Sequence, residues 1–165
     1  MKMNAGVEWA VHACALLAGL AEDKGLPAEA LAAYYELPPA YMAKQMQALS
    51  KAGLIVSHRG KAGGYRLARA PARISLWDIV AAVDGPSPYF RCTEIRQRGP
   101  CAQRGEDCTR PCPINAAFLA AEEQYRAALD AVSLADIALQ ALQDMGPGNM
   151  QASLEWLAGA ANTLK

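Results

Sequence analysis

The sequence predicts a mainly α-helical fold with a small β wing: a winged helix-turn-helix followed by a long dimerisation helix. Three observations support this fold class. Apolar residues recur at helical spacing in three short segments near the N-terminus. A basic hairpin rich in glycine follows them. A longer segment with a broad apolar face begins near residue 114.

The first three helices are expected over residues 5–22, 28–36 and 40–52. Lys24-Gly25 interrupts the first pattern, and Pro27 suits the first turn of the second helix. Leu37-Pro38 is expected to form a turn, because a residue before proline avoids helical geometry, and Pro39 can then open the third helix. The inward face of the third helix is expected to consist of Met42, Met46 and Leu49. The second and third helices would then form a helix-turn-helix.

The next elements are expected to be two strands, over residues 54–58 and 65–68, joined by a glycine-rich tip. Ser75 is expected to cap a helix over residues 76–83, and Ser133 a helix that ends at Leu142. The segment 114–131 predicts a helix whose apolar face is wider than a small monomer needs. We expect this helix to pair with its copy in a dimer, and packing within its own domain is the alternative. Residues 150–165 predict a weakly amphipathic, partly disordered tail.

The charge of the chain is zero overall, but it is unevenly distributed. Residues 37–77 contain seven Lys or Arg and no Asp or Glu, which leaves nine basic and 16 acidic residues elsewhere. A local cationic block on a neutral protein is typical of a face that binds phosphates, although a solvated basic face has the same count. Together with the hairpin, the block favours DNA as the partner.

The third helix is expected to enter the major groove of DNA, with the wing near a minor groove. The candidate DNA-binding residues are Tyr41, Lys44, Gln45, Lys51, Arg59 and Lys61. Gln45 is expected to contact bases, because glutamine bonds adenine with both amide atoms, while Lys44 and Lys51 are expected on phosphates. Arg59, in the wing, would respond to the width of the minor groove.

Four of the five cysteines lie within residues 92–112. In a reducing cytosol, such a dense group favours a metal, a cluster or a redox sensor over structural disulfides. Residues 86–113 show no regular pattern, and a bound inorganic group would explain so long a loop. Cys14 lies on the apolar face of the first helix and is expected in the core.

We expect a cytoplasmic protein that neither contacts a membrane nor acts as an enzyme. No apolar run reaches the roughly 18 residues that a membrane span needs. Glu8 and His12 stand where a signal peptide would be apolar. The chain contains two histidines, no Ser/His/Asp grouping and no nucleotide-binding glycine loop.

Two stretches resemble a known family. KAGGYRL at residues 61–67 and ISLWDIVAAVDG at residues 74–85 resemble the signature of the IscR/NsrR (Rrf2) family of winged-helix regulators. The resemblance extends from Met1 to about residue 140. It implies a homodimer, a palindromic double-stranded DNA operator and an iron–sulfur cluster at the dimer interface that senses redox state, nitric oxide or cluster supply.

Within this family, the segments around residues 6–12, 92–100 and 108–114 resemble the RsrR-like subgroup of redox sensors. This resemblance implies a 2Fe–2S cluster, in preference to 4Fe–4S, held by Glu8 and His12 of one subunit and by Cys92 and Cys112 of the other. Glu8 and His12 are four residues apart and so share one helical face, as an ordinary Glu–His pair also would.

Several alternatives for the cysteines stay open. Cys101 or Cys108 could replace Glu8 or His12 as a ligand. Four cysteines of one subunit could hold a cluster, or zinc could replace it. Cys108 and Cys112 could also close a disulfide on oxidation.

The sequence thus predicts a dimeric redox-sensing repressor in which the redox state of the cluster controls DNA affinity through the first helix. Trp9, beside Glu8, is a candidate mobile element, and a fixed core tryptophan is the alternative. Other candidate functions are a nitric-oxide or cluster-supply sensor with a different cluster type, a cluster-free thiol-based regulator, an electron carrier and a cluster-assembly accessory protein.

Four segments are expected along the chain. They are a winged helix-turn-helix DNA-binding domain over residues 1–85, a cysteine-rich cluster-binding loop over 86–113, the dimerisation helix and the following helix over 114–145, and a C-terminal tail over 146–165.

Overall fold

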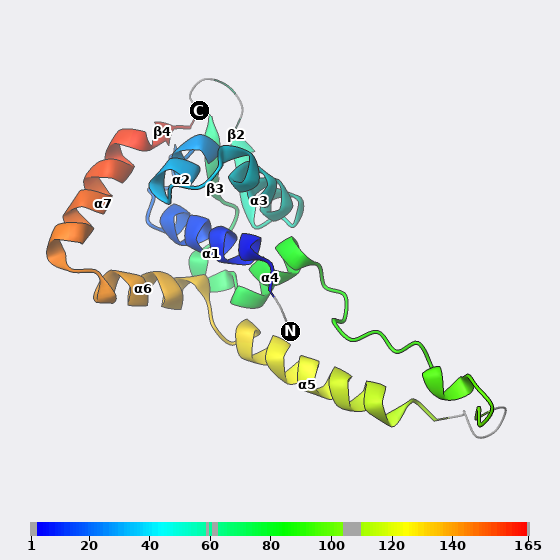
Figure 1. Cartoon of the computed structure of the whole chain (residues 1–165). Helices are drawn as coiled ribbons and strands as arrows, with labels where there is room; N and C mark the ends of the chain where they lie inside the picture. The colour runs from blue at the N-terminus through cyan, green and yellow to red at the C-terminus, as the bar shows by residue number, and fades with distance from the viewer. Residues whose placement is uncertain (1–2, 59, 61–62, 104–109, 165) are drawn as a thin grey trace. The chain divides into compact units, whose positions relative to one another are not determined.

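The computed structural model of the chain describes residues 3–58, 60, 63–103 and 110–164 (Figure 1). The chain forms two compact units: a larger one of residues 2–86 and 129–165, and a smaller one of residues 87–128. No helix among the described residues is both long enough and apolar enough to cross a membrane.

The larger unit is a winged helix-turn-helix. Its helices are α1 (Ala5–Ala18), α2 (Ala28–Tyr34), α3 (Pro39–Lys51), α4 (Leu76–Asp84), α6 (Leu134–Asp144) and α7 (Pro147–Ala160), with the short helix η1 (Pro71–Arg73). Its strands are β1 (Lys24–Gly25), β2 (Ile55–His58), β3 (Gly64–Leu67) and β4 (Asn162–Thr163). The prediction of a mainly helical fold with a small β wing is therefore confirmed.

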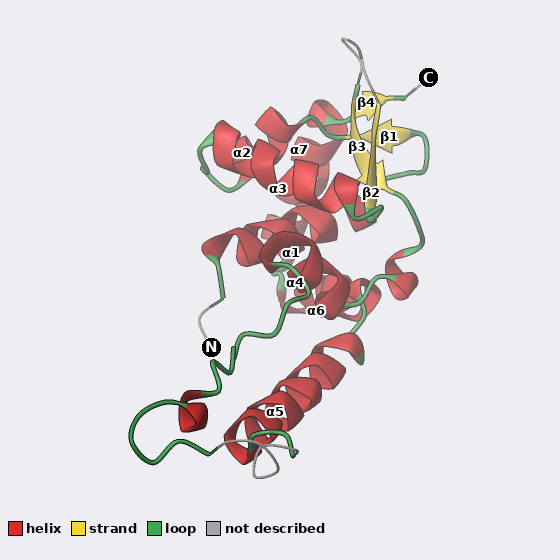
Figure 2. Cartoon of the chain, turned by 90° about the vertical axis from the view of Figure 1, so that its right-hand side faces the viewer, coloured by secondary structure: helices red, strands yellow, loops and turns green. Residues whose placement is uncertain are grey.

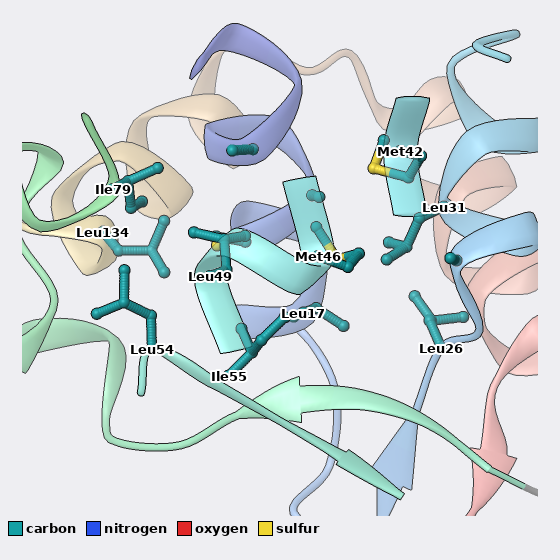
Figure 3. Packing of buried hydrophobic residues seen from close by; sticks show 14 of the residues in the cluster. Leu17, Leu26, Leu31, Met42, Met46, Leu49, Leu54, Ile55, Ile79 and Leu134 are labelled. Carbon is teal, nitrogen blue, oxygen red and sulfur yellow. The ribbon is translucent and has the colours of Figure 1, made fainter. Parts of the chain in front are cut away.

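The hydrophobic core lies where α1, α3 and their neighbours meet (Figure 3). The three residues predicted for the inward face of α3, Met42, Met46 and Leu49, are all fully buried. Side chains from the surrounding elements close over them, among them Leu17, Leu26, Leu31, Leu54, Ile55, Ile79 and Leu134. Burying a side chain of this size contributes about 1.5–3 kcal/mol, so this cluster dominates the stability of the unit.

Helices α4 and α6 begin side by side. Ser75 and Ser133, the two predicted N-caps, each form a capping box with the aspartate three residues later. Between these starts, the N–H of Leu76 donates to the Val132 carbonyl at 2.9 Å, and the N–H of Leu134 donates to the Ile74 carbonyl at 2.8 Å. Helix α6 packs against α1, so it belongs to the larger unit.

The wing is the antiparallel hairpin of β2 and β3, paired from Ile55–Leu67 to His58–Gly64. A second ribbon lies against it, because β1 pairs with β4 and the Leu26–Tyr65 bridge joins the end of β1 to β3. The four strands gather in one region of the unit in Figure 2.

The C-terminal segment differs from the prediction. Where a partly disordered tail was expected, residues 147–160 form α7, and Asn162–Thr163 form β4. Pro147 opens the helix, and Leu157 is buried in the core. The periodic pattern of α7 is weak because small residues separate its apolar ones, so its tertiary contacts determine its position.

The smaller unit contains the short helix η2 (Ile95–Gln97) and most of α5 (Pro113–Asp130). Its described segment before α5 has little regular structure, as predicted. Glu122 fastens that segment to α5: its Oε2 accepts from the Tyr89 N–H at 3.0 Å, and its Oε1 accepts from Arg126 Nε at 3.1 Å. The rings of Phe90 and Phe118 stack with centroids 4.4 Å apart.

Candidate functional site

Helix α3 presents a polar outer face. Because Met42, Met46 and Leu49 point into the core, Tyr41, Lys44 and Lys51 lie on the opposite side and are exposed. Tyr41 is 58% exposed. These three predicted DNA-binding residues are accessible to a nucleic acid.

The prediction that Gln45 contacts bases is wrong for this structure. Gln45 is 5% exposed, and its amide lies against Gly6 of α1, where a β-carbon on the glycine would be 2.7 Å away. The helical spacing already indicated that Gln45 is buried, because position 45 lies on the same helix face as the inward positions 42, 46 and 49. Gln47, in contrast, is exposed on α3.

The tip of the wing is described only in part. Arg59 and Lys61, predicted to approach the minor groove, lie outside the described residues. Gly60 has a positive φ of 106°, which favours glycine at this turn. Arg66, on β3, donates from Nε to His58 Nε2 at 3.3 Å.

Glu8 and His12 lie one turn apart on α1, and both are exposed, whereas the opposite side of α1 is buried in the core. Both residues line an apolar groove of about 360 Å³, formed within the larger unit by α1, α4 and α6 together with Leu129, near the end of α5. The ring of His12 lies 5.1 Å from that of Tyr35. Burial, with a smaller effect of Tyr34, raises the pKa of Tyr35 to about 12.

Trp9 connects α1 to the start of α3. It is half-buried, and its ring meets the ring of Tyr41 edge-on with centroids 6.0 Å apart. The candidate mobile residue therefore touches a candidate DNA-binding residue. Glu8 directly precedes Trp9 in α1.

The smaller unit brings Cys92 and Cys112 together. Both side chains line a hollow of about 760 Å³ that Arg96 and Arg110 also line, and each thiol affects the pKa of the other. Cys112 directly precedes α5, so its sulfur accepts hydrogen bonds from the first backbone N–H groups of the helix. Sequence spacing placed both cysteines in one loop, and the structure makes them neighbours.

The two thiols have opposite shifts in pKa. The N–H of Asn115 lowers the pKa of Cys112, the N–H of Ile114 and the charge of Arg96 lower it further, and burial opposes them. For Cys92, the N–H of Glu94 lowers the pKa, but burial, the Glu94 carboxylate and the Cys112 thiol together raise it above its usual value. Cys112 is therefore the more readily ionised thiol of the pair.

Sequence reasoning missed Glu94 and Arg96, which organise this loop. Glu94 adopts a left-handed φ of 49°, and its N–H donates to Cys92 Sγ at 3.4 Å. Its carboxylate accepts from Arg96 Nε at 2.8 Å, and Arg96 holds the pKa of Glu94 below its usual value. Arg96 Nη2 donates to the Arg110 carbonyl at 2.7 Å, so it ties together the two arms of the loop that carry the thiols.

The other cysteines have separate places. Cys101 is exposed, and Cys108 lies outside the described residues. Cys14 is buried in the core, as predicted, and burial raises its pKa to about 12.

The donors fit a site for iron or zinc that is completed by further ligands. Paired thiolates suit both metals. Among the described residues, no three His, Cys, Asp or Glu side chains are grouped closely enough to hold a metal ion. Glu8 and His12, the other predicted ligands, belong to the larger unit.

Comparisons with known proteins give a consistent picture. The sequence model of the Rrf2 family, described as iron-dependent transcriptional regulators, matches residues 3–140. The chain is 31% identical over 147 residues to the HTH-type transcriptional regulator Rv1287 of Mycobacterium tuberculosis, which covers 87% of this chain and 85% of that protein.

Two solved structures are similar to the fold. IscR of T. potens has a TM-score of 0.65 at 24% identity and covers 92% of this chain and 96% of its own. CymR of B. subtilis, described as a global cysteine regulator, has a TM-score of 0.65 at 21% identity and covers 85% of this chain and 98% of its own.

Proposed function

Because the chain belongs to the Rrf2 family of transcriptional regulators, we propose that it is a dimeric, redox-sensing repressor with a 2Fe–2S cluster at its dimer interface. Its relatives are transcriptional regulators rather than enzymes, and regulators of this family bind DNA. Glu8 and His12 of one subunit and Cys92 and Cys112 of the other would hold the cluster.

The observation that carries the proposal is the thiol pair of Cys92 and Cys112. The N-terminus of α5 lowers the pKa of Cys112, and thiolates are the usual ligands of iron–sulfur clusters. Arg96 holds the two arms of the loop together, so both sulfurs are pre-positioned. When bound, the cluster would supply a one-electron couple.

Glu8 and His12 support the proposal as the second pair of donors. They are exposed, one turn apart, and they line an apolar groove that a second chain could cover. Neutral histidine is a common metal ligand.

A dimer is supported by the exposed apolar residues at the start of α5. Ile114 is 59% exposed, Phe118 52% and Leu119 39%. An apolar helix face of this kind is typical of a surface that pairs with its copy. A two-fold dimer would place two α3 helices on a palindromic operator.

DNA affinity would change because α1 packs directly against α3. Gly6 lets α1 lie directly against the buried Gln45 amide, and Trp9 touches Tyr41. A shift at Glu8 or His12 would therefore alter the position of α3, whose Tyr41, Lys44 and Lys51 would contact DNA together with Arg59 and Lys61 of the wing.

Reduction of the metal-loaded protein tests the proposal. Anaerobically reconstituted protein is expected to be red-brown, and a duplex that it selects from a random-sequence pool serves as the probe. Chemical reduction should change its affinity for this duplex at fixed salt by about five- to 150-fold, the usual range of allosteric coupling. Lys44→Ala is the control, since it should weaken binding in both redox states.

Each part of the proposal can fail separately. A colourless protein after reconstitution would exclude the cluster. A coloured protein whose affinity does not respond to reduction would exclude the redox switch. A protein that does not bind duplex DNA at low salt would exclude the proposed DNA contact.

The same thiols favour a second candidate, a cluster-free thiol-based regulator. A peroxide could oxidise Cys92 and Cys112 to a disulfide, with both thiol protons and the two electrons passing to the peroxide as it forms water. In that case the metal-free protein would lose two hydrogens in its mass on peroxide treatment, and its DNA affinity would change without any colour. Unchanged affinity after complete disulfide formation would exclude this candidate.

A further inference from the structure

The last described residues of the chain lie against the base of the wing. β4 pairs with β1, and the amide of Asn162 donates from Nδ2 to the carbonyl of Gly63 at 2.7 Å. Gly63 directly precedes β3, and its N–H donates to the Gly60 carbonyl at 2.9 Å. Asn162 therefore holds the residue at which the wing tip returns to its second strand.

Two further contacts fix β4 in place. Lys24 Nζ donates to Thr163 Oγ1 at 2.7 Å, and the N–H of Leu164 donates to the Asp23 carbonyl at 2.8 Å. The side chain of Leu164 also covers Gly25, where an added β-carbon would lie 3.0 Å from it. The segment is thus bonded both to the loop before β1 and to the wing.

The backbones at the wing base approach closely because two glycines meet there. A β-carbon on Gly64 would lie 2.9 Å from the backbone of Gly25 and Leu26. The N–H of Leu26 donates to the Tyr65 carbonyl at 3.0 Å, and the N–H of Tyr65 donates to the Leu26 carbonyl at 2.8 Å. A displacement of β1 or β4 would therefore also displace β3.

Helix α7 anchors the other end of this segment on the helix-turn-helix. Its Leu157 is buried, its Trp156 ring meets Tyr34 of α2 at 4.9 Å, and Ser153 Oγ lies 2.6 Å from the Tyr34 hydroxyl. α7 and β4 thus connect α2 to the wing. Both lie beyond residues 3–140, which match the family model.

We propose that β4, through Asn162, is a positioning element for DNA binding that holds the wing ready for the minor groove. The inference rests on the proposed contact of the wing with DNA, and it does not depend on the cluster. A hairpin that is already ordered loses less conformational entropy on binding than a free one. Asn162 would act on DNA through Gly63 and would not touch DNA itself.

Asn162→Ala in the full-length reconstituted protein, compared with the wild type in the same redox state, tests this inference. Removing one hydrogen bond from the wing base should weaken binding to the selected duplex about fivefold. If the wing then loses a phosphate contact, the slope of log affinity against log salt should become shallower by about one. Hydrogen exchange of the backbone amides of residues 63–65 should become faster. The thermal unfolding midpoint of the protein should stay equal to that of the control variant described next.

Gln151→Ala is the matched control, because it removes an amide from the same segment. Gln151 is exposed, and its Nε2 donates to Glu155 within α7 at 2.6 Å. The Gln151→Ala protein should match the wild type in its affinity for the duplex, in the salt dependence of that affinity and in the hydrogen exchange of residues 63–65. Leu164→Ala, which uncovers Gly25, should reproduce the faster exchange of Asn162→Ala to a smaller extent.

Unchanged exchange of residues 63–65 in Asn162→Ala would overturn the inference, since β4 would then not hold the wing. Faster exchange with unchanged affinity and salt slope would overturn it as well, because the position of the wing would not matter for binding. If the wild type does not bind duplex DNA at all, the proposed function fails, while the exchange experiment still decides whether β4 holds the wing.

Discussion

The two units of the chain are stabilised in different ways. The larger unit buries a contiguous set of aliphatic side chains from α1, α2, α3 and the wing strands. In the smaller unit, the buried residues among those described are Cys112 and Glu122, neither of which is a large hydrophobic residue. Ion pairs, helix-end hydrogen bonds and stacked rings hold the smaller unit together instead.

The larger unit therefore supplies most of the stability of the fold, while the smaller unit carries the reactive thiols. A buried aliphatic cluster gives the larger unit a fixed shape that can present α3 and the wing. The smaller unit leaves Ile95 and Ile114 exposed next to its thiols, and it has little apolar burial of its own. We therefore expect substitutions in the two units to affect different properties.

The largest effect is expected at the thiol pair. Cys92→Ser should abolish the visible absorption of the reconstituted protein, because a serine hydroxyl is a poor ligand for the iron of an iron–sulfur cluster. Its thermal midpoint before reconstitution should equal that of the wild type, since Cys92 lies outside the core. Cys101→Ser, at an exposed cysteine, should keep the colour, and a coloured Cys92→Ser protein would assign the ligand elsewhere.

The core of the larger unit should respond in stability. Leu49→Ala leaves a cavity between α3 and α1 and should lower the free energy of unfolding by about 2–5 kcal/mol. Urea denaturation followed by circular dichroism measures this loss. A loss below about 1 kcal/mol would mean that the core tolerates the cavity, which would weaken the contrast between the units.

Phe118→Glu tests the apolar face of α5. A charge on this face should raise the dimer dissociation constant at least about tenfold, as for a central interface residue. Sedimentation velocity over a range of concentrations measures it. Leu154→Glu, at a residue of α7 with the same 52% exposure, is the control and should leave the dimer unchanged. Equal effects of the two variants would contradict a dimer built on α5.

The cap of α6 should have a smaller effect. Ser133→Ala removes the side-chain acceptor for the Asp136 N–H and should cost about 1 kcal/mol of unfolding free energy. Chemical denaturation at neutral pH measures the loss. Ser87→Ala, at an exposed position of the smaller unit, should cost nothing measurable.

The smallest effect concerns pH. The Ser133 hydroxyl, followed by its backbone N–H, lowers the pKa of Asp136 from its usual 3.8 in the folded state. The carboxylate therefore stabilises the fold above pH 3.8, and this stability is lost as the pH falls through the lowered pKa. Asp136→Asn should flatten the acid side of the stability profile, and an unchanged profile would contradict the cap.

Much of the larger unit was predictable because its elements carry local signals. Prolines before α2 and α3, serines before α4 and α6, and the glycine-rich hairpin mark boundaries that the structure keeps within a few residues. α7 and β4 carry no such signal. Their positions depend on contacts with Tyr34 and Gly25, which are distant in sequence.

The candidate site was predictable in its residue types but not in its organisation. The spacing of the cysteines indicated a metal or redox loop, yet Glu94 and Arg96 become meaningful only when the loop folds back on itself. Gln45 is the reverse case. Its amide chemistry suggested a contact with a base, but its position on the helix places it in the core.

The contact between Gly6 and Gln45 restricts how this sequence can vary. A methyl group at position 6 would displace the buried amide at position 45, so an alanine there needs a shorter partner on α3. Two such substitutions would be harmful singly and tolerated together. Positions 6 and 45 are therefore expected to vary together among homologues of this protein.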